Sequence, residues 1–99
     1  MNTQLTEKKA YQEKVEAQLE KLNGQIDELS AKAKQAQAEA KIEYQNQVEE
    51  LIVKRDAAQA KLQELQQASE QAWEEVKAGF EKAWGELNSA FETAVAKFQ

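Results

Sequence analysis

Residues 72–82 read AWEEVKAGFEK, and residues 83–93 read AWGELNSAFET. The second stretch repeats the first, and AVAKFQ (94–99) begins a third, shorter copy. Large apolar residues recur at steps of three and four, the spacing of one face of an α-helix. An eleven-residue period gives about 3.67 residues per turn, which predicts a straight or slightly right-handed amphipathic helix over residues 69–99. Its predicted apolar face, a candidate association surface, consists of Trp73, Val76, Phe80, Trp84, Leu87, Phe91, Val95 and Phe98.

Upstream of this repeat the apolar residues follow a seven-residue pattern, which is typical of a left-handed coiled coil. The middle segment, AKAKQAQAEAK (31–41), contains only good helix formers that are poor in strands. The sequence therefore predicts a long heptad-type coiled-coil helix over residues 1–68, rich in Ala in its middle. Its predicted seam runs through Tyr11, Val15, Leu19, Leu22, Ile26, Leu29, Ala33, Ala36 and Ala40, reaches Tyr44 through two consecutive steps of four, and resumes at Val48, Leu51, Arg55, Ala58, Leu62 and Leu65.

The composition changes after residue 68, and a turn at residues 66–70 is the favoured break. Ser69 is a good N-cap, and Glu70 would follow in the first turn, where the helix dipole favours an acid. Asn23-Gly24 and a stutter near residues 44–47 are alternative break points. A single uninterrupted helix is the remaining alternative.

The amino-acid composition argues against several classes of function. The 99 residues include no His, no Cys and no Pro, and the formal net charge is −5. Without His and Cys there is no thiol nucleophile and no His-based triad, and most metal sites are excluded. Net negative charge disfavours nucleic acid, because phosphate binding needs clustered Lys and Arg. We therefore expect no enzymatic activity, no catalytic residues, no cofactor and no metal.

The exposed apolar stripe predicts assembly. An amphipathic helix is stable only when its apolar face is covered. A hairpin broken near residue 68 would leave the segment from about Tyr11 to Ala40 uncovered, and a second copy could cover it. The expected fold is thus all-α: a long coiled-coil helix or helical hairpin that assembles as a homo-oligomeric helical bundle, with an antiparallel dimer favoured. Because the N-terminus lacks a signal-peptide pattern, we expect a cytoplasmic protein.

The sequence is compatible with two further roles. An aromatic amphipathic helix can lie on a membrane surface. However, residues 69–99 carry six Glu against three Lys, a net charge of −3, which makes membrane binding less favoured than helix packing. A protectant or chaperone-like role is compatible with the Ala- and Gln-rich helix.

A family likeness is carried by AKAKQAQAEAKIEYQNQVEEL (31–51), KRDAAQAKLQEL (54–65) and ASEQAWEEVKAGFEKAWGELNSAF (68–91). The chain resembles small bacterial coiled-coil proteins named after a cyanobacterial stress-response protein, over about residues 25–98. The doubled Ala-Trp unit, at Ala72-Trp73 and Ala83-Trp84, is its specific part, while Gly85 and Asn88 depart from the charged residues expected there. The resemblance implies an all-helical structure and a stress-associated role, and it implies no catalytic residues.

Overall fold

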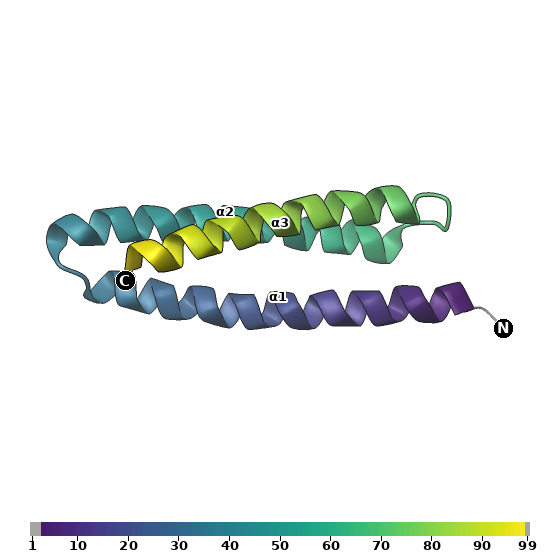
Figure 1. Ribbon diagram of the computed structural model, residues 1–99, viewed down its shortest axis with the longest axis horizontal. Helices are drawn as coiled ribbons and strands as arrows, with labels where there is room; N and C mark the ends of the chain where they lie inside the picture. Colours follow the sequence, from purple (N-terminus) through teal and green to yellow (C-terminus); the bar gives the residue numbers. More distant parts are fainter. Residues whose placement is uncertain (1–2, 99) are drawn as a thin grey trace.

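The computed structural model describes residues 3–98, and side chains from residue 7 onward. The described residues form three helices, α1 (Thr3–Gln35), α2 (Ala38–Gln67) and α3 (Trp73–Phe98), each antiparallel to the one before it, with no strand among them (Figure 1). The molecule is a rod of 58 × 18 × 18 Å. The predicted all-α class is therefore confirmed.

The turn between α2 and α3 overlaps the predicted break at residues 66–70, but α3 begins later than expected, so Ser69 is not its N-cap and Glu70 precedes its first turn. Residues 68–72 leave the helical conformation, and α3 begins at Trp73. The Ser69 hydroxyl accepts a hydrogen bond from the Ala72 backbone N–H at 3.2 Å, and the Ser69 carbonyl accepts from the same N–H at 3.1 Å. Ser69 thus stabilises the turn ahead of α3. The acids of the first helical turn are Glu74 and Glu75.

A second turn, at Ala36 and Gln37, was not predicted. Residues 1–68 were expected to form one helix, but α1 ends at Gln35 and α2 begins at Ala38. The two alternative break points, at residues 23–24 and 44–47, both lie within continuous helix. The local sequence favours helix throughout, so tertiary packing decides the break: the turn lets the apolar stripe of α1 pack against the same chain.

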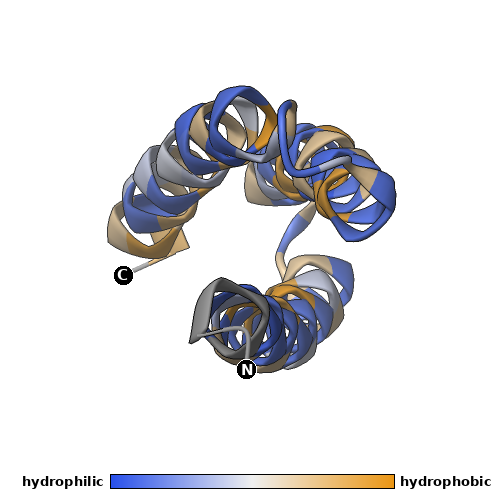
Figure 2. Cartoon of the chain, turned by 90° about the vertical axis from the view of Figure 1, so that its right-hand side faces the viewer, coloured by the Kyte–Doolittle hydropathy of each residue, from blue (hydrophilic) through white to orange (hydrophobic). Residues whose placement is uncertain are grey.

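The core lies along the axis of the rod, where the apolar stripes of the three helices meet. An end-on view shows their hydrophobic residues turned inward (Figure 2). No polar or charged residue is buried among those whose side chains the structure describes. The buried residues are Val15, Leu19, Leu22, Ile26, Leu29 and Ala33 from α1; Val48, Leu51, Ala58, Leu62 and Leu65 from α2; and Trp73, Phe80, Leu87 and Ala94 from α3.

Because of this packing, a second copy is not needed to cover the apolar stripe of α1. The segment from Tyr11 to Ala40 was expected to need cover from a second copy. Instead the turn at residues 36–37 folds α1 back, and its stripe is buried within one chain. The seam position of Arg55 is half-buried, and its guanidinium pairs with the Asp56 carboxylate at 2.9 Å.

Candidate association surface on α3

The eight residues of the predicted face lie on the inner side of α3, with unequal burial. Trp73, Phe80 and Leu87 are at most 6% exposed and lie seven residues apart, and the buried Ala94 continues this spacing. The other five, Val76, Trp84, Phe91, Val95 and Phe98, are half-buried and pack against the core.

The burial of α3 follows a seven-residue period, although its sequence repeats every eleven residues. Trp84 is the repeat equivalent of Trp73, yet Trp73 is buried and Trp84 is half-buried. The seams of α1 and α2 advance by 3.5 residues per turn, so a neighbouring helix packs into them with the same period. The partner helices therefore decide which aromatic residues occupy the centre of the interface.

α3 packs more closely on one side than on the other. On one flank, Gly79 faces α2, where an added Cβ would lie 3.9 Å from Cδ of Lys61. On the other flank, Phe91, Val95 and Phe98 line a hollow together with α1 residues. α3 thus lies closer to α2 than to α1 (Figure 2).

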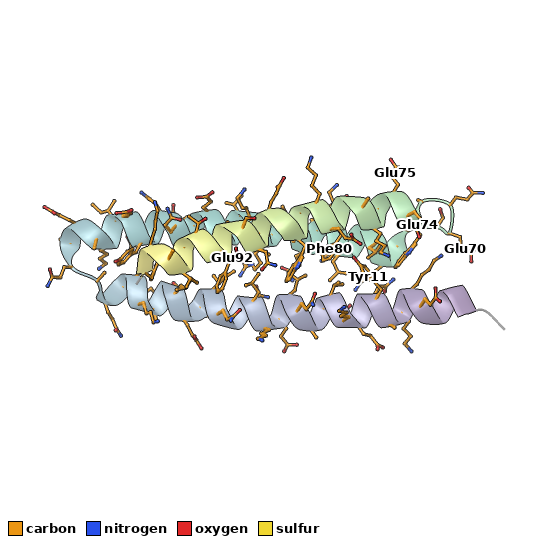
Figure 3. The ribbon with its side chains drawn as sticks, viewed as in Figure 1. Tyr11, Glu70, Glu74, Glu75, Phe80 and Glu92 are labelled. Atoms are coloured by element: carbon orange, nitrogen blue, oxygen red, sulfur yellow. The ribbon has the colours of Figure 1, made fainter. Side chains whose placement is uncertain are left out.

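Tyr11 of α1 anchors the first half of the surface (Figure 3). Its ring meets Trp73 and Phe80 edge-on, with centroids 6.1 and 6.5 Å away. Lys77 Nζ lies 4.8 Å from the Tyr11 ring centroid, a cation–π contact. The Tyr11 hydroxyl donates to Glu81 Oε1 at 3.3 Å.

The surroundings of Tyr11 also change its acidity. Burial, then the negative charge of Glu81 and the hydrogen bond to it, raise the pKa of Tyr11 to about 12. All three causes favour the neutral phenol, because the phenolate would be desolvated and placed beside a carboxylate. Tyr11 therefore serves as a neutral packing and hydrogen-bonding residue.

Tyr44 of α2 anchors the second half of the surface. The Tyr44 and Phe98 rings are stacked, with centroids 4.2 Å apart. Beside them, Lys97 Nζ lies 3.5 Å from Glu43 Oε1. The hollow between α1 and α3 is lined here by Gln25, Glu28, Leu29, Lys32, Phe91, Val95 and Phe98. The sequence identified the α3 residues of this surface, whereas Tyr11 and Tyr44 were predicted only as seam residues.

The surface is suited to packing against the apolar face of a helix. Within residues 3–98 no group of three or more His, Cys, Asp or Glu residues converges as a metal site would. None of the helices in this range is both long and apolar enough to cross a bilayer. The surface can hold an apolar helix flanked by polar and charged residues, as it holds α1.

Comparisons of this chain with protein-family models, with curated proteins and with solved structures give no match.

Proposed function

We propose that this protein is a non-enzymatic coiled-coil protein that acts by helix-mediated self-association, in the stress-associated role that the sequence resemblance implies. The association surface is the aromatic face of α3 together with the adjoining seam of α2. Its ligand is an amphipathic helix with a seven-residue apolar repeat, and the first partner is a second copy of the chain.

The observation that carries this proposal is the way the surface holds α1. Two buried aromatic residues of α3, Trp73 and Phe80, meet Tyr11 of a helix that is far away in the sequence. Helices packed through heptad seams can make the same contacts within one chain or between chains. A face that binds one such helix has the shape and period to bind another.

Light scattering over a range of concentrations tests the proposal. We expect the mass of the native particle to rise from one chain, 11.2 kDa, towards two chains as concentration increases. A folded wild-type particle that stays at one chain mass throughout would contradict self-association.

A second candidate function is binding to a lipid surface. Its support is that Trp84, Phe91, Val95 and Phe98 are all half-buried on the last described helix. The opposing consideration is charge, because interfacial helices are typically rich in Lys and Arg, and residues 69–99 carry −3. Tryptophan emission should shift to the blue with phosphatidylcholine or phosphatidylglycerol vesicles if α3 binds lipid. An unchanged spectrum with both lipids would exclude this role.

A further inference from the structure

We propose that two copies associate by exchanging α1. In the exchanged dimer the turn at residues 36–37 straightens, α1 and α2 become one continuous helix, and α1 of each chain packs on α2 and α3 of the other. This inference rests on the proposed self-association and specifies its route. The chains then run antiparallel, and each end of the dimer repeats the three-helix arrangement of the closed chain.

The first observation is that the turn at residues 36–37 lacks the residues that normally stop a helix. Gln37 occupies the N-cap position of α2 at φ −70° and ψ 158°, and its side chain makes no capping hydrogen bond. No residue in 3–98 has positive φ, so α1 does not end in the left-handed conformation of a glycine C-cap. In contrast, the turn at residues 68–72 holds the Ser69 hydroxyl against the Ala72 N–H.

The second observation is that the turn consists of strong helix formers. Residues 31–41 contain only Ala, Lys, Gln and Glu, which have high helix propensity. Straightening the turn gives Ala36 and Gln37 the hydrogen bonds of a helix interior. The turn therefore persists only because it lets α1 pack on its own chain. When α1 packs on a second copy, the turn is no longer needed.

The third observation is that the apolar stripe continues at helical spacing across the turn. Leu29, Ala33, Ala36, Ala40 and Tyr44 follow one another by steps of four, three, four and four residues. A continuous helix over residues 3–67 thus presents a single seam to an antiparallel copy. Near the two-fold axis this seam carries Ala, whose small side chain lets two helix axes approach closely.

A second copy is the occupant because exchange preserves every contact of α1. The edge-on contacts of Tyr11 with Trp73 and Phe80 form again between chains, as does the hydrogen bond from the Gln66 amide to Glu16. Opening without a partner would expose six buried apolar residues, Val15, Leu19, Leu22, Ile26, Leu29 and Ala33. The open chain is therefore populated only when another copy supplies α2 and α3. Short two-residue connections of this kind favour exchange between chains.

Gln37→Pro tests the role of the turn. Proline fixes φ near −65°, which matches Gln37 in the closed chain, but inside a helix it removes an N–H and clashes with the carbonyl four residues earlier. The variant should disfavour opening about 100-fold per chain, and therefore weaken the dimer about 10⁴-fold, since two turns must straighten. Gln37→Ala is the control, and it should dimerise at least as tightly as wild type. Sedimentation measures the dissociation constants of all three proteins.

Spin labels test the geometry directly. The chain has no Cys, so Lys21→Cys with Gln59→Cys creates one label pair at exposed sites on α1 and α2. The doubly labelled chain is diluted with unlabelled chain, so that only distances within one chain are measured. In the closed chain the labels lie on adjacent helices with axes about 10 Å apart. In a continuous helix, 38 residues separate them by about 57 Å.

The expected result is a long distance of about 57 Å that grows with concentration in step with the dimer. A dimer that keeps only the short distance, and that forms equally well with Gln37→Pro, would overturn the exchange while leaving self-association in place. A native protein that stays monomeric would overturn both.

Discussion

At the scale of single residues, Tyr11 connects α1 to the association surface. Its ring lies against Trp73 and Phe80, and its hydroxyl donates to Glu81. Two half-buried tyrosines, Tyr11 and Tyr44, thus pack against the two ends of α3, and each was visible in the sequence only as an apolar seam residue. The sequence shows that an aromatic residue is on a seam, but the choice of its partner depends on how three helices are registered.

The acidity of Tyr11 gives a pH prediction. Its pKa rises from 10.0 in the unfolded chain to about 12 in the fold, so the folded state holds the phenolic proton more tightly. The stability that this provides is fully present below pH 10 and is lost as pH rises from about 10 to 12. Absorbance titration in a Tyr44→Phe background should show a phenol that ionises near pH 12.

Glu81→Gln is the informative variant for this titration. It replaces the carboxylate beside the phenol with a neutral amide of similar shape, so the pKa of Tyr11 should fall below about 12, while burial keeps it above 10.0. If the titration curves of the two proteins coincide, the contact between Tyr11 and Glu81 is absent in solution.

Asn23 gives a second prediction at the residue scale. The Asn23 side chain is half-buried, and its enclosed Oδ1 has no hydrogen-bond partner, which makes the side chain unfavourable in the fold. Asn23→Ala should therefore raise the free energy of unfolding by about 1–2 kcal/mol, through both removal of the unpaired oxygen and better helix propensity.

Asn88→Ala is the matched control, because Asn88 is exposed within α3 and gains helix propensity alone. Thermal unfolding should show the larger rise in Tm for Asn23→Ala. Equal rises in both variants would mean that the Asn23 amide is solvated.

At the level of secondary-structure elements, the sequence predicted the turn between α2 and α3 but not the turn between α1 and α2. Only the first turn is marked by a local sequence feature. The amino-acid composition changes near Ser69, between the end of α2 and the start of α3. Ala36 and Gln37 resemble their helical neighbours, so no local feature distinguishes them. The turn exists because α1 packs back on the chain, and a contact between residues 11 and 73 is invisible to any local pattern.

Phe80 and Trp84 of α3 should contribute unequally to the free energy of unfolding, because they are buried to different extents. Phe80→Ala should lower the free energy of unfolding by about 3–5 kcal/mol, since the ring is 1% exposed at the centre of the core. Trp84→Ala should cost less, about 1–2 kcal/mol, because its indole is half-buried. Urea unfolding measures both. Equal losses would indicate that the eleven-residue repeat, and not the seven-residue spacing, governs the interface.

At the scale of the whole molecule, the sequence predicted an all-α protein whose apolar stripe must be covered. It did not predict that the chain could cover the stripe alone. The closed rod has a Cα radius of gyration of 16.1 Å. A continuous helix over residues 3–67 would be about 97 Å long, at 1.5 Å per residue. Small-angle scattering with an absolute mass therefore distinguishes closed monomers from exchanged dimers.

The aromatic face of α3 should be covered by a helix in the native particle, whether that helix comes from the same chain or from a second copy. Acrylamide quenching of Trp73 in a Trp84→Phe variant measures this cover, because Trp73 is then the sole indole and is 6% exposed. We predict strong protection of Trp73 at all concentrations, lost only on unfolding. Quenching of native Trp73 as fast as in the urea-unfolded chain would show that the face is uncovered.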